Sequence, residues 1–148
     1  MSGDDAEGRQ APGAGSGHAR PVLLRHQSLA LHAYGVVGKV SGKQQRKDYE
    51  RAVKNLGANI LRSGLAAAMA ALERRSDRGK RLLDHLARAG IPGLEAATAD
   101  DLPERVRGLD VDAYMIATRQ MLHLAAWLKR AAQATFVDDD DAEQAEIG

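Results

Sequence analysis

The sequence predicts an all-α protein, a compact bundle of five to six helices between two disordered tails. Alanine, the best helix former, occurs 27 times. Apolar residues recur at spacings of three and four, which is the period of a half-buried helix. Strands are not expected, because no segment alternates apolar and polar residues with a period of two. The absence of cysteine excludes a disulfide framework.

The first three helices are expected at about residues 21–40, 42–62 and 65–75. Pro21 suits the first turn of a helix, and Ser41-Gly42 is a typical break. Ser63 is expected to be the N-cap of the third helix. In the second helix, the apolar residues that share one face are Tyr49, Ala52, Val53, Leu56 and Ile60.

The last three helices are expected at about residues 77–89, 101–107 and 112–137. In the first of these, Leu82, Leu83 and Leu86 are expected to face inward. The longest helix would be capped by Asp110 or Asp112 and would extend roughly 39 Å. It is apolar over about half of its circumference, so we expect it at the centre of the bundle with neighbours on two sides.

The two ends of the chain are expected to be tails, with one domain between them. Residues 1–19 are rich in Gly, Ala and Ser without periodicity, and residues 138–148 carry six acidic residues and no basic one. Residues 20–137 should form the helical bundle. The longest apolar run, Leu65 to Leu72, is too short to span a bilayer, and no signal peptide is recognisable, so a cytoplasmic protein without membrane contact is expected.

The net charge of +1 conceals a basic body between acidic ends. Residues 18–137 hold 20 Lys and Arg against 11 Asp and Glu, and residues 39–81 hold 12 against 4. This distribution is typical of a protein that contacts a polyanion, although it also suits a merely soluble one.

The first candidates for phosphate contact lie on the second helix, where steps of four, four and three keep the cations on one stripe: Lys43, Lys47, Arg51 and Lys54. A second group around the next two turns would extend the patch: Arg62, Arg74, Arg75, Arg78, Lys80 and Arg81. Lys129 and Arg130 near the end of the last helix could contact a nucleic acid or offset the helix dipole. The alternative for each group is a solvated helix face.

Three residues of the last helix are expected to be structural or to lie at subunit contacts. Arg119 stands among apolar residues, and Asp84 or Glu73 could pair with it. Trp127 is interpreted as a core residue in preference to a platform for base stacking, and Tyr114 begins the apolar stripe. Because aromatic residues are so few, RNA binding would be mainly electrostatic and independent of sequence.

No constellation of catalytic residues is recognisable, and neither a cofactor nor a metal is expected. The five histidines have no metal-ligand spacing, and no nucleophile elbow or phosphate-binding loop occurs. Two alternatives remain open. One is a helical DNA-binding regulator with a helix-turn-helix at Ser63-Gly64, and the other is a metal-dependent nuclease that uses Asp138–Asp141.

Two segments of the sequence are distinctive: residues 56–75, LGANILRSGLAAAMAALERR, and residues 114–134, YMIATRQMLHLAAWLKRAAQA. Together they resemble a known family, the small subunit of the type III-B CRISPR–Cas (Cmr) effector complex. The first segment is similar to the family's helix–turn–helix segment, and the second is similar to its C-terminal helix. Tyr49 and Val53-Lys54 are also similar to its second helix.

The resemblance implies a helical subunit without catalytic residues that serves antiviral defence. It would stack with copies of itself along the minor filament of the complex and contact other Cmr subunits. It would also support the binding of guide RNA and target RNA, while other subunits carry out cleavage.

Overall fold

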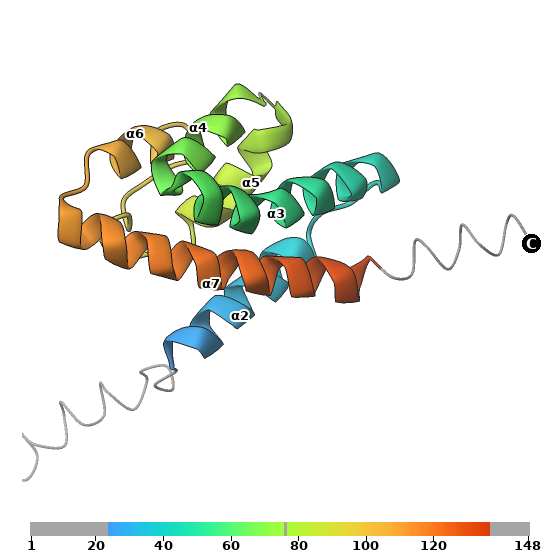
Figure 1. Ribbon diagram of the computed structural model, residues 1–148. Helices are drawn as coiled ribbons and strands as arrows, with labels where there is room; N and C mark the ends of the chain where they lie inside the picture. Colours follow the sequence, from blue (N-terminus) through green and yellow to red (C-terminus); the bar gives the residue numbers. More distant parts are fainter. Residues whose placement is uncertain (1–23, 76, 137–148) are drawn as a thin grey trace, which may run out of the picture.

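The structure, a computed structural model, describes residues 24–75 and 77–136, except for the side chain of Arg78. Six helices and no strand occur in these ranges, which confirms the all-α prediction (Figure 1). The helices are α2 (Arg25–Val37), α3 (Lys43–Ser63), α4 (Leu65–Arg74), α5 (Asp77–Ala87), α6 (Leu102–Arg107) and α7 (Val111–Thr135).

Helix α7 is the central helix of the bundle. Its 25 residues extend about 38 Å, and it packs against both α2 and α3. Figure 1 shows α2 crossing α7 while α3 runs along it. Helix α4 packs in turn against α3, α5 and α6. The expectation that the longest helix lies centrally, with neighbours on two sides, is therefore confirmed.

One hydrophobic cluster joins all six helices. The inward face predicted for α3 is confirmed at every position, as are the three leucines of α5. These helices place their apolar residues on one stripe and their charges on the other, so burial of that stripe is the favourable arrangement. The largest fully buried side chains include Leu56, Met69, Leu86, Met121 and Leu128.

Helix α2 departs from the prediction. It ends at Val37 instead of Val40, and its buried residues Leu29, Ala33 and Val37 follow a strict spacing of four. The helical spacing of the apolar residues between 22 and 40 would also place Leu31 and Tyr34 on the inward stripe, but they are exposed by 63% and 45%. The predicted start of this helix at residue 21 lies outside the described residues.

The predicted cap of α4 is wrong. Ser63 is the last residue of α3, and Gly64 occupies the N-cap with a φ of 91°, a conformation that favours glycine. Because glycine has no side chain, the N-cap residue itself supplies no acceptor to the free backbone N–H groups in the first turn of α4. Instead, the N–H of Ala66 donates to the hydroxyl of Tyr114 on α7, at 2.9 Å. A residue 48 positions away in sequence therefore caps α4.

The connection between α5 and α6 contributes to the core. Ile91 and Leu94 are fully buried although they lie outside any helix. The carboxylate of Asp101 accepts from the backbone N–H of Thr98 at 2.7 Å, and this hydrogen bond, with Arg105, lowers the pKa of Asp101. Of the two residues expected to cap α7, Asp110 is the N-cap, because its carboxylate accepts a hydrogen bond from the N–H of Ala113 at 2.8 Å.

Among the described residues, no helix combines the length and the apolar character that crossing a lipid bilayer requires. The predicted division into residues 1–19, 20–137 and 138–148 stays a prediction, since both tails lie outside the described ranges.

Candidate nucleic-acid interface

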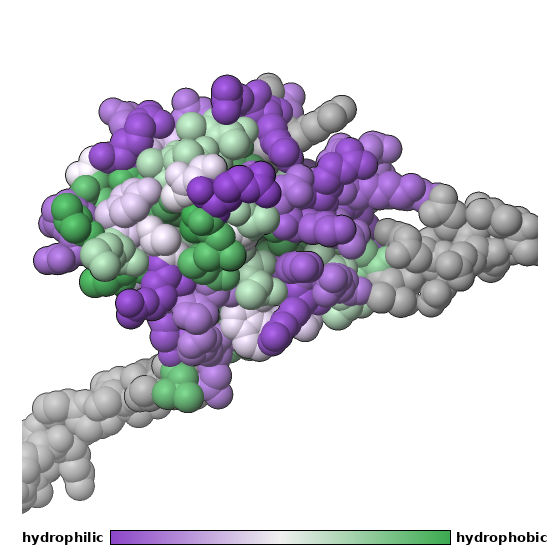
Figure 2. Space-filling view, in the orientation of Figure 1, coloured by the Kyte–Doolittle hydropathy of each residue, from purple (hydrophilic) through white to green (hydrophobic). Residues whose placement is uncertain are grey.

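The basic stripe predicted on α3 lies on the surface of the bundle. Lys43, Lys47, Arg51 and Lys54 are all exposed, while the opposite face of the helix is buried. In Figure 2, hydrophilic side chains gather over the N-terminal half of α3. Lys47, Arg51 and Lys54 line one shallow hollow together with Glu50. The sequence placed these cations on one stripe, and the fold leaves that stripe accessible to solvent.

The tertiary structure connects this stripe to the turn between α4 and α5. A second hollow is lined by Asp48, Arg51, Ala52 and Arg75. Arg51 and Arg75 are 24 residues apart in sequence and border the same space. Arg74 is also exposed, on the last turn of α4. The patch therefore continues from one helix to the next.

The other basic candidates are more scattered. Arg62 is exposed on the last turn of α3, eleven residues beyond Arg51, which is about 16 Å along the helix. Lys129 and Arg130 are exposed on α7, where the guanidinium of Arg130 lies 5.2 Å from the centre of the Trp127 ring. Arg78 lies in α5, and its side chain is outside what the structure describes.

The three structural or interface candidates occupy different surroundings. Tyr114 is half-buried and caps α4. Trp127 is half-buried against the hydrophobic core. Arg119 is exposed, and among the described residues it forms no ion pair with Asp84 or Glu73, so its role at a subunit contact stays a prediction. Asp84 accepts from Arg88 at 3.0 Å, and Glu73 lies 3.7 Å from Arg107.

A buried hydrogen-bonded pair was not anticipated from the sequence. The hydroxyl of Tyr49 lies 2.7 Å from Nδ1 of His85, and Nε2 of His32 lies 2.7 Å from the His85 carbonyl oxygen. Burial raises the pKa of Tyr49 and lowers that of His85 to about 4. The tyrosine therefore donates to a neutral imidazole near pH 7, and this network joins α2, α3 and α5.

The geometry also bears on the two alternatives to an RNA-binding subunit. In α4 the residues Leu65, Ala68, Met69 and Leu72 are buried, so this helix does not present a polar recognition surface as a helix-turn-helix requires. Within residues 24–75 and 77–136, no three His, Asp or Glu side chains group into a metal site. The Asp138–Asp141 run lies outside the described residues.

The fold and surface define a class: a small α-helical protein whose surface is basic along one long helix and around the neighbouring turn. Comparison with known proteins gives the particular family. The family described as CRISPR-associated protein (Cas_Cmr5) matches residues 25–135, three quarters of the chain. The chain therefore belongs to the Cas_Cmr5 family.

Two relatives agree with this assignment. The chain is 33% identical over 109 residues to the CRISPR system Cmr subunit Cmr5 of Thermotoga maritima, and the match covers 71% of this chain and 79% of that protein. The crystal structure of a CRISPR-associated Cmr5 family protein from Thermus thermophilus is similar with a TM-score of 0.68. That match has 29% identity and covers 76% of this chain and 98% of the other.

Proposed function

We propose that this protein is a non-catalytic small subunit of a cytoplasmic type III-B CRISPR (Cmr) complex and that it supports guide and target RNA in antiviral defence. Membership of the Cas_Cmr5 family supports the setting. The observation that carries the RNA role is the exposed stripe on α3 and its continuation to Arg75. Exposed cations at helical spacing repel one another mildly, and phosphates relieve that repulsion.

A second surface suits contact with other subunits or with further copies of the chain. Val111, Met115 and Arg119 follow one another at a spacing of four on the exposed side of α7. Val111 and Met115 are exposed by 74% and 59%, and Leu61 at the end of α3 by 76%. Figure 2 shows hydrophobic atoms gathered over the N-terminal part of α7 and the neighbouring end of α3. Exposed apolar groups of this kind are typical of protein–protein contacts.

The RNA role is tested by reversing two charges of the stripe. Arg51 and Lys54 are replaced by glutamate, and the affinity of the assembled complex for target RNA is measured over a range of salt concentrations. We expect affinity to fall roughly tenfold or more and the dependence of log affinity on log salt to become shallower by about 0.7 for each lost phosphate contact. Unchanged binding at low salt would refute phosphate contact by this stripe.

The matched control reverses the same amount of charge elsewhere. Arg105 and Arg107 of α6 are exposed, and each already pairs with a carboxylate, Asp101 and Glu73 respectively. Their replacement by glutamate should leave RNA affinity within about twofold, because neither residue lines the two hollows of the α3 stripe. An equal loss in both variants would show a general effect of net charge.

The contact role is tested by placing charge on the apolar stripe. Met115→Lys should reduce the recovery of this subunit with the rest of the complex, because a desolvated lysine in a subunit contact is costly. Leu31→Lys is the control, since Leu31 is equally exposed but lies on α2. If the two variants assemble alike, the stripe on α7 is not a subunit contact.

A further inference from the structure

A third basic hollow lies beyond the patch already described. It has a volume of about 350 Å³, and its polar lining comes from Lys39 between α2 and α3 and from Lys80, Arg81, Asp84 and His85 on α5. This size falls in the range of small ligand sites. Lys39 is 41 residues from Lys80 in sequence, so only the packing of α5 against α3 and its preceding loop brings these cations together.

The charge balance of this hollow favours an anion. Asp84, its one carboxylate among the lining residues, is already held by Arg88 at 3.0 Å. Lys80 lies 3.5 Å from Asp100, but both side chains are mostly exposed, so that pair is weak. Lys39 and Arg81 form no ion pair with any residue that the structure describes. Three cations therefore face the hollow with little internal compensation.

One polar lining residue of the hollow carries no charge at neutral pH. This residue is His85, and its Nδ1 is occupied by the hydroxyl of Tyr49 at 2.7 Å. Because burial lowers the pKa of His85 to about 4, the imidazole is neutral near pH 7, and the positive charge comes from the lysines and Arg81 alone.

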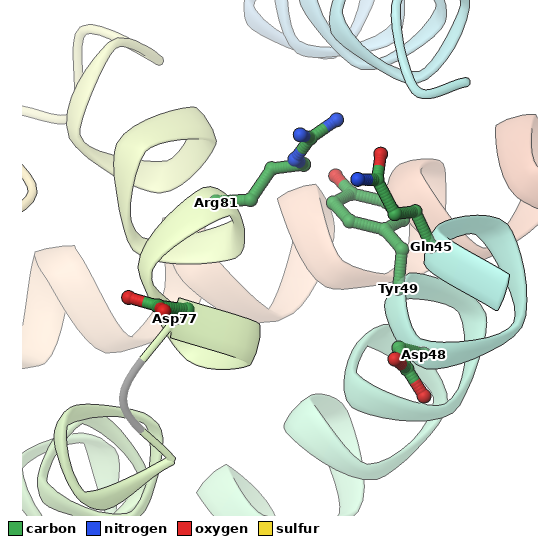
Figure 3. A pocket seen from close by; sticks show the side chains of 5 residues that line it. All are labelled: Gln45, Asp48, Tyr49, Asp77 and Arg81. Atoms are coloured by element: carbon green, nitrogen blue, oxygen red, sulfur yellow. The ribbon is translucent and has the colours of Figure 1, made fainter. Parts of the chain in front are cut away.

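Shared residues connect this hollow to the α3 stripe. An intermediate hollow, shown in Figure 3, is lined by Gln45, Asp48, Tyr49, Asp77 and Arg81. Arg81 borders both this space and the third hollow, while Asp48 borders both this space and the hollow of Arg51 and Arg75. In Figure 3 the Arg81 guanidinium and the Gln45 amide lie toward one end, and the carboxylates of Asp48 and Asp77 lie toward the other.

We infer that the hollow between Lys39, Lys80 and Arg81 binds a backbone phosphate of the same RNA strand that contacts the α3 stripe. The inference rests on the proposed function and extends it by giving the path of the strand over the surface. This path runs from Lys54 across Arg51 and Arg75 to Arg81 and Lys39. Between Arg75 and Arg81 the strand crosses the intermediate hollow, whose lining also includes Asp48 and Asp77. A single phosphodiester is recognised here by charge and not by base, so this contact is independent of sequence.

The experiment removes charge from this hollow alone. Lys39→Gln and Arg81→Gln are combined, and target RNA binding by the assembled complex is measured against salt. We expect the affinity to fall roughly tenfold and the dependence of log affinity on log salt to become shallower by about 0.7, which corresponds to one phosphate that is no longer neutralised. Arg105→Gln with Arg107→Gln removes the same charge from α6 and should bind like the unaltered protein. Thermal unfolding of each purified subunit checks that the fold is retained.

The outcomes separate this inference from the proposed function. If Arg51→Glu with Lys54→Glu weakens binding but Lys39→Gln with Arg81→Gln does not, the strand does not reach the third hollow and the inference fails, while the proposed function stands. If neither variant weakens binding, both fail. If inorganic phosphate shifts the amide signals around Lys39 and Arg81 but RNA affinity is unchanged, the hollow takes free phosphate and the RNA assignment is overturned.

Discussion

The hydrogen bond between α7 and the start of α4 offers a sharp test of the fold. Tyr114→Phe removes one hydroxyl and keeps the ring, so no cavity forms and the packing of α7 is retained. What is lost is the acceptor for the N–H of Ala66, at 2.9 Å. This N–H belongs to the first turn of α4, where no other residue of the helix can accept it.

The expected loss of stability follows from the cost of an unmade cap. A hydrogen bond of this kind contributes about 0.5–1.5 kcal/mol net, and removal of a capping side chain costs about 0.5–2 kcal/mol. Because Ala66 is only half-buried, water can partly replace the hydroxyl. We therefore expect the free energy of unfolding to fall by about 1 kcal/mol, which lowers Tm by about 4 °C.

The assay is urea unfolding followed by circular dichroism, with Tyr34→Phe as the control. Tyr34 loses the same atom, but its side chain is 45% exposed and makes no hydrogen bond to a described residue. The control should remain within about 0.5 kcal/mol of the unaltered protein. Hydrogen exchange at the Ala66 amide should accelerate in Tyr114→Phe alone. Equal stability and equal exchange in both variants would refute the cap.

Two further predictions concern pH and close packing. Because the folded state holds the pKa of His85 at about 4, below the ordinary 6.5, the unfolded chain binds more protons between these values, and stability must fall as pH drops from 6.5 to 4. Between pH 7 and pH 5 the loss should be about 2 kcal/mol in urea titrations, and His85→Gln should largely remove this pH dependence; a variant with the unaltered slope would contradict the assignment. Gly79→Ala should destabilise by more than about 1 kcal/mol, because a Cβ there would collide with the Leu72 carbonyl oxygen. Gly35→Ala, whose added Cβ meets nothing within 4 Å in the last turn of α2, should instead stabilise by about 0.5–1 kcal/mol in the same measurement, and equal changes at both glycines would disprove the contact.

The parts of the fold that were predictable are those whose signal is local and strongly periodic. Helix α3 has apolar residues on one face and charges on the other, so its inward residues followed directly from the spacing. Helix α2 also carries apolar residues on its outer side, at Leu31 and Tyr34. Periodicity cannot decide between two apolar faces, because only the position of α7 determines which of them is covered.

The wrong predictions concern positions where a residue distant in sequence takes the role that local sequence rules assign to a neighbour. Ser63 is a typical N-cap by type, yet the role belongs to Tyr114, which no local rule can associate with α4. The buried Ile91 and Leu94 lie beside Gly90 and Pro92, residue types that are typical of a helix end but give no indication that the connection returns to the core.

The candidate interface was likewise predictable only in part. The stripe from Lys43 to Lys54 was predictable because four cations share one helix. The association of Arg51 with Arg75 required the packing of α4 against α3, and that of Lys39 with Arg81 required the packing of α5. Which of these side chains contact RNA stays a prediction.

Helix α7 is fastened at both ends, and this has a mechanical consequence. Near its start, Tyr114 binds the first turn of α4. At its end, Phe136 lies 5.1 Å beneath the guanidinium of Arg46, whose Nε donates to the Val40 carbonyl at 3.0 Å. These anchors are 22 positions apart, which is about 33 Å along the helix. Because no Gly or Pro interrupts the helix between them, a displacement of one end should move the other end, beside the loop that carries Lys39, as one body.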